Sequence, residues 1–305
     1  MGMQAGRTVH LMGTVITLVI NGGPNAGTLA DQVVEQLRAA EHRFSANDES
    51  ADLMKINASA GQGPVEAAPD LYQLIKLGVH YSKYPGGNLN VAIGPLVKLW
   101  HIGFQDARVP SQAEIDWALA LTDPRQITLD DVTHSVSLNR PGMEIDLGAL
   151  AKGFIGDQVI AWLKEQGVES ALLNLGGSTV IGLGGNTENE DGMWHVGIQN
   201  PADPAQAYGQ VVSIKDQALT TSGVAERKLT TNGKTYHHIL NPQTGYPDET
   251  TVVSMSLVTP TAFLGELWTT MLFGKTKEQI AAVVKTLEQT VGVLIEDDGT
   301  VIQLR

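Results

Sequence analysis

The spacing of apolar residues along this chain changes between the period of a strand and the period of a helix. Residues 8–20 combine short alternation with an apolar run, which predicts a strand pair or one long strand bent at Gly13. In residues 26–44 the apolar side chains recur three or four positions apart, with charged residues such as Glu35 on the opposite side. The chain is therefore expected to begin with β-structure that leads into a long amphipathic helix.

The same two periods predict the elements of the remaining chain. Helical spacing is found again in residues 69–84, 111–121, 261–273 and 276–288. Alternation or short apolar runs predict strands in residues 126–138 (a hairpin), 171–175, 193–198, 210–214, 251–258, 291–296 and 301–304. Residues 45–59 are polar, and the Gly- and Asn-rich residues 85–95 fit neither period and are expected to be a loop.

Many predicted strands follow one another directly, without a helix between them. This order favours an α+β fold with mainly antiparallel sheets flanked by helices over a doubly wound parallel sheet. There is no internal repeat and no linker-like tract, so we expect a single two-lobed unit over residues 1–305.

Composition excludes several classes of function. The chain has 305 residues, a formal net charge of −13 and no cysteine. Its acidity argues against a nucleic-acid surface, and the lack of cysteine excludes disulfides, thiolate catalysis and zinc–thiolate sites. No run of residues is long and apolar enough to span a membrane, and the N-terminus lacks the pattern of a signal peptide. We therefore expect a cytoplasmic protein, or an exported one from which a leader has been removed.

The first candidate site lies in residues 144–177. An apolar run expected to be a strand ends at Asp146, a helix carries Lys152, and a second strand ends in Gly176 and Gly177. A lysine beside bare backbone N–H groups suits a phosphate or a pyrophosphate. The same pattern also fits an αβ unit with a buried polar pair and a tight turn, and the local sequence does not decide between the two.

The second candidate site is the pair His237 and His238. Adjacent residues of a strand point to opposite faces, so only one of these histidines can face a given pocket. The nearby Ser222 and Gly223 add a hydroxyl and bare backbone. The alternative is a structural histidine held by hydrogen bonds.

The third candidate site is the pair Glu266 and Thr270, which are four residues apart and therefore on one face of the predicted helix. A carboxylate and a hydroxyl at this spacing can hold a hard cation such as Mg²⁺ through oxygen ligands. The alternative is a surface glutamate beside a threonine that bonds back to its own backbone.

Taken together and in this order, motifs along nearly the whole chain resemble those of the ApbE family of flavin transferases. The motifs are Met12-Gly13-Thr14, Phe44-Ser45 with Asn57, Gly94-Pro95-Leu96 with Trp100, Asp146-Leu147-Gly148, Ala151-Lys152-Gly153 with Asp157, Leu175-Gly176-Gly177, Asn200-Pro201, Thr221-Ser222-Gly223, His238 with Pro242 and Thr244-Gly245, and the segment 261–274. The family implies a Mg²⁺-dependent transfer of FMN from FAD to a Thr or Ser hydroxyl of an acceptor protein, with release of AMP.

The resemblance also implies roles for individual residues. The FAD site would be lined by Met12, Asn47, Asn90, Val91, Ala92, Lys152, Gln158 and Leu240. The carbonyl oxygen of Ile155 would join Glu266 and Thr270 around Mg²⁺, and His238 would transfer a proton near the phosphate, where Lys152 and the Gly176 and Gly177 amides neutralise charge. Ser222 is expected at the same site.

Four positions depart from the usual pattern of the family. Asn47 stands where an aromatic residue is common, Asn90 opens a loop that often has Asp-x-Thr, and Asn241 replaces an aspartate. Glu266 replaces the metal-binding aspartate and is one methylene longer, which Mg²⁺ tolerates poorly. Two further hypotheses therefore stay open beside the transferase: a Mg²⁺-dependent hydrolase that splits FAD into FMN and AMP, and a catalytically weak FAD-binding protein.

Overall fold

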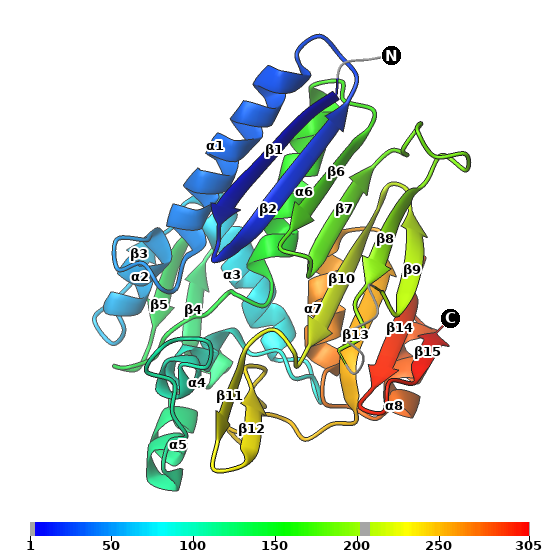
Figure 1. Ribbon diagram of the computed structural model, residues 1–305. Helices are drawn as coiled ribbons and strands as arrows, with labels where there is room; N and C mark the ends of the chain where they lie inside the picture. Colours follow the sequence, from blue (N-terminus) through cyan, green and yellow to red (C-terminus); the bar gives the residue numbers. More distant parts are fainter. Residues whose placement is uncertain (1–3, 202–207, 305) are drawn as a thin grey trace.

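A large antiparallel sheet forms the centre of the computed structural model, which describes residues 4–201 and 208–304. Its strand order is β1-β2-β6-β7-β10-β13-β14-β15, and every neighbouring pair is antiparallel (Figure 1). These strands are β1 (Gln4–Leu11), β2 (Thr14–Asn21), β6 (Ala171–Leu175), β7 (Thr179–Leu183), β10 (Gln217–Gly223), β13 (Val252–Thr259), β14 (Val291–Glu296) and β15 (Val301–Leu304). The expected α+β class with mainly antiparallel sheets is confirmed.

Three smaller sheets and eight α-helices of the described chain complete the fold. The small sheets are β3 (Val65–Glu66) with β5 (Ser135–Leu138) and β4 (Ile127–Asp130), the hairpin β8 (Trp194–Ile198) and β9 (Gln210–Ile214), and the hairpin β11 (Lys228–Thr231) and β12 (Lys234–His237). The helices are α1 (Ala26–Phe44), α2 (Asp52–Ala58), α3 (Pro69–Ser82), α4 (Gly94–Trp100), α5 (Gln112–Leu119), α6 (Ala151–Glu165), α7 (Ala262–Leu272) and α8 (Lys277–Val284).

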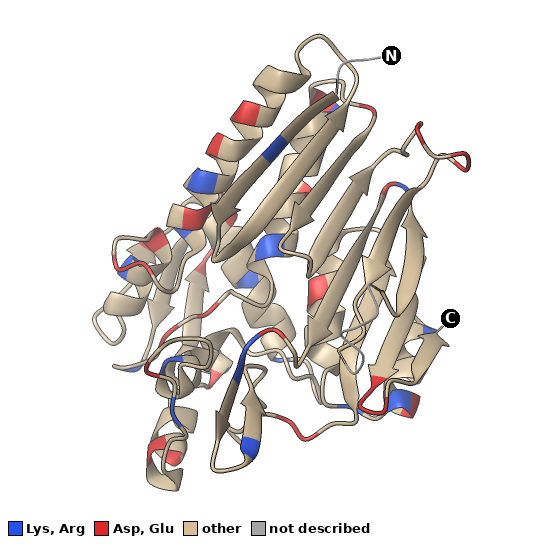
Figure 2. Cartoon of the chain, viewed as in Figure 1, with Lys and Arg blue, Asp and Glu red and all other residues tan. Residues whose placement is uncertain are grey.

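The two faces of the large sheet are covered differently. Helices α6 and α7 lie on one face, where Gly156 contacts Ile181 of β7 and Gly265 contacts Thr220 of β10. The β8–β9 hairpin covers the other face, where Trp194 packs beside Gly182 in an apolar cluster. Charged residues are accordingly found mainly on helices and loops rather than on the central strands (Figure 2).

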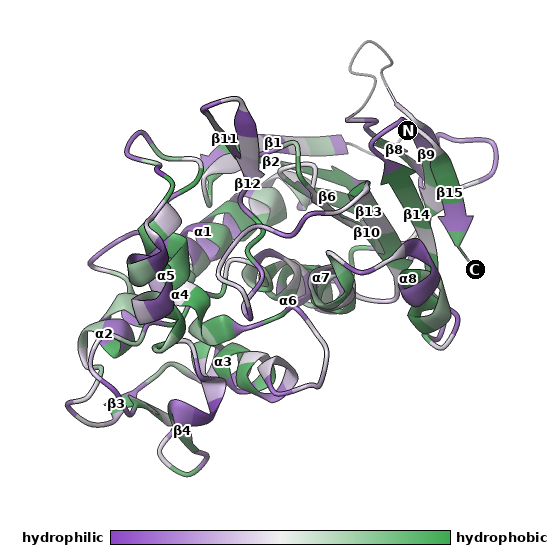
Figure 3. Cartoon of the chain, turned by 90° about the horizontal axis from the view of Figure 1, so that it is seen from below, coloured by the Kyte–Doolittle hydropathy of each residue, from purple (hydrophilic) through white to green (hydrophobic). Residues whose placement is uncertain are grey.

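A third layer lies beyond α6 and α7. Helix α3 is on the far side of these two helices from the sheet, and α2, α4, α5 and β3–β5 belong to the same side of the molecule (Figure 3). An aromatic series connects the layers, because Phe154 of α6 contacts both Phe44 of α1 and Phe263 of α7, and Phe263 contacts Tyr81 of α3. Helices α6 and α7 are thus enclosed between the large sheet and the outer helices.

The first hairpin shows why the chain bends at Gly13. Leu11 pairs with Thr14, so Met12 and Gly13 form a two-residue turn with φ of 54° and 68°. Positive φ at both positions is the turn geometry that fits the twist of a hairpin. Met12 is a non-glycine residue in the left-handed region, and its N–H donates to Glu41 Oε1 at 2.5 Å.

Several expected elements are confirmed and others are wrong. Helix α1 has the predicted bounds, and Thr276 and Gln279 form the predicted capping box of α8, which nevertheless ends at Val284. Residues 85–95 were expected to be a loop, yet they contain the start of α4, and the polar residues 45–59, for which no element was predicted, contain α2. Strands β7 and β10 were not predicted; β7 is buried at every residue and so lacks the alternation of a half-buried strand.

The strand expected to end at Asp146 does not exist, because side-chain and loop partners satisfy its backbone. Buried Asn57 accepts from the N–H of Ile145 at 2.7 Å and donates to its carbonyl at 3.0 Å. The N–H of Asp146 donates to the carbonyl of Val91 at 2.9 Å. This segment is therefore fixed between α2 and the loop before α4 instead of in a sheet.

Helices α6 and α7 approach each other closely at their first turns. A Cβ on Gly153 would lie 2.7 Å from the backbone carbonyl carbon and oxygen of Ala262. The carboxylate of Asp157, one turn later on α6, accepts from the N–H groups of Ala262 and Phe263, both at 2.8 Å. Asp157 thereby caps α7, and its negative charge suits a helix N-terminus.

We predict that Gly153→Ala destabilises the protein by about 1–3 kcal/mol, because an overpacked contact between two backbones cannot relax by moving a side chain. Urea denaturation measures the change in free energy of unfolding. Gly27→Ala is the matched control: a Cβ there meets only Arg7 Nη2 at 3.9 Å, so better helix propensity should stabilise α1 by up to about 1 kcal/mol. Equal stability of Gly153→Ala and wild type would contradict the close contact.

Candidate active site at the α6–α7 junction

Lys152 joins the first turn of α6 to the turn that follows β6. Its Nζ donates a hydrogen bond to the hydroxyl of buried Ser178, one residue after the diglycine. The carbonyl of Ser178 in turn accepts from the N–H of Thr221 on β10 at 2.8 Å. The lysine and the diglycine, which are about 25 residues apart in sequence, therefore meet at one end of the sheet.

The diglycine presents fewer unpaired backbone N–H groups than the sequence suggested. Gly176 and Gly177 have φ of 76° and 78°, and a Cβ on Gly176 would collide with the Thr14 side chain. The N–H of Gly177 donates to Asn174 Oδ1 at 2.7 Å. The expectation of a free amide at Gly177 is therefore wrong in this conformation, and the turn serves first to let β2 approach.

Glu266 of α7 is a buried carboxylate with one free oxygen. Its side chain is 5% exposed, Oε1 accepts from the hydroxyl of Thr179 at 2.8 Å, and Oε2 has no hydrogen-bond partner among the described residues. Burial raises the pKa of Glu266 to about 7, against the opposing effects of the Lys152 charge and of hydrogen bonds from Gly153 and Thr179. A buried carboxylate oxygen that accepts no hydrogen bond is unfavourable, and a bound cation can serve as its missing partner.

The donor set around Glu266 fits a hard cation. Thr270 lies one turn along the same helix, and no group of three or more His, Cys, Asp or Glu side chains within the described residues could hold a metal ion. A cation here would take Glu266 Oε2 together with hydroxyl and carbonyl oxygens, the ligands Mg²⁺ prefers. Ile155 has a buried hydrocarbon side chain without a ligating atom, so it could contribute only its carbonyl oxygen, and this role stays a prediction.

The two histidines have different partners. His237 is held at both ring nitrogens, with Nε2 donating to the carbonyl of Asp248 at 2.8 Å and Nδ1 accepting from the N–H of Ile239 at 3.2 Å. His238 Nδ1 lies 3.3 Å from the carbonyl of Arg227, which only accepts, so Nδ1 carries the proton. His237 is thus a structural histidine, and His238 keeps the lone pair of Nε2 available.

His238 is neutral under ordinary conditions. Burial lowers its pKa to about 4, and the positive charges of Arg227 and Lys152 act in the same direction. The Lys152 charge also lowers the pKa of Glu266, so this lysine acts on both groups. Ionisable groups with such shifted pKa values gather at catalytic sites.

Three predicted FAD contacts have buried side chains. Val91 and Ala92 are in the main core, and Leu240 belongs to the apolar cluster of α4 and α5. The Asn90 side chain connects two segments of the chain: it accepts from the N–H of Ala92 at 2.9 Å and donates to the carbonyl of Thr122 at 2.8 Å. Any contact of Val91, Ala92 or Leu240 with a ligand would have to use backbone atoms.

The remaining predicted residues lie nearer the surface. Asn47 is exposed in the loop after α1, Gln158 is exposed on α6, and Met12 is half-buried at the β1–β2 turn. Ser222 is two residues after Thr220 on β10 and therefore shares the sheet face that carries α7. Their contacts with FAD stay predictions.

Asp146 lies in the segment before α6. Its carboxylate accepts from the N–H of Gly148 at 2.7 Å, and burial raises its pKa. The charges of Arg227 and Lys98 oppose this rise, and the charge of Glu144 adds to it. The closeness of Asp146 to Lys152 stays a prediction.

Three residues near the site had no role in the predictions from sequence. Thr179 holds Glu266, Asp157 holds α7, and Arg227 is the only described arginine whose side chain has no hydrogen-bond or ion-pair partner among the described residues. Asp157 was visible in its motif, but without a partner. Thr179 carries no local signal, because its partner Glu266 comes from a distant segment.

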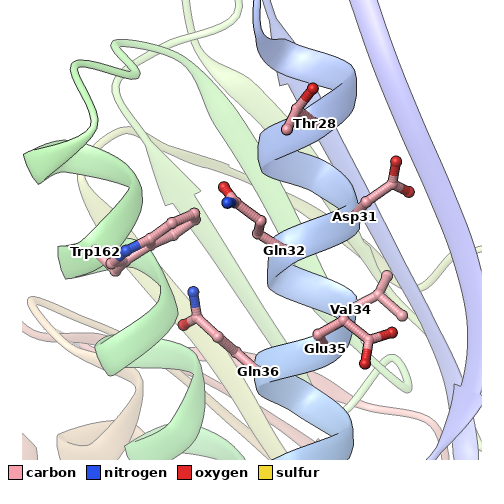
Figure 4. Close-up of a pocket in the computed structure, with 7 residues that line it drawn as sticks. All are labelled: Thr28, Asp31, Gln32, Val34, Glu35, Gln36 and Trp162. Carbon is pink, nitrogen blue, oxygen red and sulfur yellow. The ribbon is translucent and has the colours of Figure 1, made fainter.

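A shallow hollow elsewhere on the surface does not contribute to the site. It has a volume of about 600 Å³ and lies between α1 and α6, where Trp162 faces Gln32 and Gln36 (Figure 4). Asp31 at its edge pairs with Arg7 at 2.6 Å. It contains none of the predicted site residues.

The geometry agrees with the comparisons with known proteins. A model of the ApbE family matches residues 12–295. The chain belongs to the ApbE family. The FAD:protein FMN transferase of Klebsiella pneumoniae (strain 342) is 38% identical over 292 residues, which cover 96% of this chain and 89% of that protein. The expectation of an ApbE-family transferase is confirmed.

Solved ApbE structures share the fold. The ApbE protein of Thermotoga maritima superposes with a TM-score of 0.89 at 26% identity and covers 99% of this chain and 97% of its own. The flavin transferase ApbE of Vibrio cholerae gives a TM-score of 0.84 at 25% identity, with 100% of this chain and 98% of its own covered.

Among the described residues, no helix is long and apolar enough to cross a membrane.

We predict that an NMR titration of His238 gives a pKa near 4, because burial and the positive charges of Arg227 and Lys152 disfavour the imidazolium. At neutral pH the ¹⁵N shifts should show a neutral ring with the proton on Nδ1. His237 should show the opposite tautomer, protonated on Nε2. A His238 pKa near the ordinary 6.5, or the same tautomer in both rings, would contradict these assignments.

Proposed function

We propose that this protein is a Mg²⁺-dependent FAD:protein FMN transferase. It would cleave FAD, attach FMN through a phosphoester bond to a Thr or Ser hydroxyl of an acceptor protein, and release AMP. The observation that carries the proposal is the buried Glu266 oxygen that has no hydrogen-bond partner among the described residues, together with the Lys152 charge, which acts on both Glu266 and neutral His238, in a chain of the ApbE family.

Charge neutralisation is the first requirement of the reaction. A diphosphate repels an incoming oxygen, and positive charge fixed beside it lowers that barrier. Lys152 is half-buried and anchored to Ser178, and Arg227 is an exposed cation whose side chain has no partner in the described part of the chain. A bound Mg²⁺, held by Glu266, Thr270 and the Ile155 carbonyl, would supply further charge to the diphosphate.

Proton transfer is the second requirement. The acceptor hydroxyl must lose its proton as its oxygen bonds to the phosphorus of the FMN half, while the bond from that phosphorus to the AMP oxygen breaks. His238 is neutral, and its Nδ1 donates to the Arg227 carbonyl, which leaves Nε2 to accept the proton. The Arg227 carbonyl fixes the ring orientation.

The test is incubation of the purified protein with FAD and Mg²⁺, with and without a candidate acceptor protein. The proposal expects AMP in equal amount to FMN bound covalently to the acceptor, measured by chromatography and intact mass. AMP with free FMN, independent of acceptor, would instead establish an FAD hydrolase. FAD retained without AMP release would establish a binding protein.

We predict that His238→Asn lowers kcat for FAD cleavage by about 10²- to 10⁴-fold with little change in KM, the range expected for loss of a general base. The control is His195→Asn, since His195 is an exposed histidine on β8, the strand covering the opposite face of the sheet. Equal losses in kcat and in FAD affinity would make His238 a binding residue instead.

We predict that Arg227→Gln raises KM for FAD by about tenfold, since a hydrogen bond to a charged group contributes about 1.5–3 kcal/mol. The glutamine keeps the backbone carbonyl that holds His238, so kcat should change less. Arg125→Gln is the matched control, because Arg125 is exposed and paired with Asp123. An unchanged KM in Arg227→Gln would remove this residue from the FAD site.

A further inference from the structure

Thr179 and Glu266 form a buried pair between the sheet and α7. Thr179 is the first residue of β7 and is fully buried, with 0% of its surface exposed. Its hydroxyl donates to Glu266 Oε1 at 2.8 Å, and Glu266 Oε2 is left without a partner among the residues described. The threonine therefore supplies a hydrogen bond to one of the two carboxylate oxygens, Oε1.

The position of α7 explains why this contact needs a glutamate. Gly265 lets α7 approach β10 so closely that a Cβ there would lie 2.4 Å from Thr220 Oγ1. From this distance the Glu266 side chain reaches the first residue of β7. An aspartate at the same position is shorter by one C–C bond, so its carboxylate oxygens would lie about 1.5 Å farther from the Thr179 hydroxyl.

We propose that Thr179 is a positioning residue, which fixes Oε1 of Glu266 so that Oε2 alone is presented to a divalent cation. This inference rests on the proposed function for the identity of the cation. Partners of this kind orient a ligating group, and their loss typically weakens metal binding by roughly 10- to 100-fold. In this chain the Thr179 hydroxyl binds Oε1 of the longer glutamate side chain, so only Oε2 would be left to bind the cation.

Thr220 provides a matched control one strand away. It pairs directly with Thr179 in the register of β7 and β10, and it is also buried, at 2% exposure. Its hydroxyl lies against Gly265 but has no hydrogen-bond partner in the described chain. Thr220→Val thus removes a buried hydroxyl beneath the same helix without touching Glu266.

The experiment measures binding of Mn²⁺ alone, without FAD, by electron paramagnetic resonance. Thr179→Val should bind Mn²⁺ roughly 10- to 100-fold more weakly than wild type, whereas Thr179→Ser, which keeps the hydroxyl, should bind close to the wild-type level. Thr220→Val should also bind at the wild-type level. Thermal unfolding of each variant shows whether it is folded at the temperature of the titration.

A double variant tests the role of side-chain length. In a Glu266→Asp background the carboxylate no longer reaches Thr179, so Thr179→Val should cause no further loss of Mn²⁺ affinity. Equal losses in the two backgrounds, an equal loss in Thr220→Val, or wild-type affinity in Thr179→Val would each overturn the inference. A wild-type protein that binds no Mn²⁺ would overturn it as well.

The outcomes separate this inference from the proposed function. If Mn²⁺ binding depends on Thr179 but no FMN is transferred, the positioning role stands and the transferase proposal fails. If FMN is transferred while Thr179→Val binds Mn²⁺ like wild type, the transferase proposal stands and the positioning role fails.

Discussion

The contact between the first turns of α6 and α7 is the constraint on which the site depends. Gly153 lets the two backbones touch, and Asp157 holds the first two N–H groups of α7. Lys152 belongs to the same turn of α6, and Glu266 follows one turn into α7. The packing of two backbones therefore sets the separation of a cation and a carboxylate, and a side chain at position 153 would alter it.

Burial makes that pair of charges chemically useful. In water a glutamate, a lysine and a histidine would each keep an ordinary pKa, and their mutual influence would be small. Here burial raises the pKa of Glu266 and lowers the pKa of His238, while the Lys152 charge favours the ionised carboxylate and the neutral imidazole. A chain of net charge −13 can thus present a binding site for an anion, because a few cationic groups placed close together make the local potential positive.

Local patterns predicted the elements that have one buried face. Helix α1 has such a face, and its period is visible in the sequence. Strand β7 is buried at every residue, since α6 covers one face and the β8–β9 hairpin the other. Residues 144–146 have a strand-like sequence but take their partners from Asn57 and Val91.

The sequence by itself determined the chemistry of the site: a lysine near a diglycine, one of two histidines, and a glutamate with a threonine four residues later. These are local relations, which helical and strand spacing preserve. Only the tertiary structure decided that His238 rather than His237 keeps a free nitrogen, that Asn174 takes the Gly177 amide, and that Thr179 takes one oxygen of Glu266. Thr179 and Glu266 are 87 residues apart, and contacts at that distance depend on sheet order and helix packing, which no local period encodes.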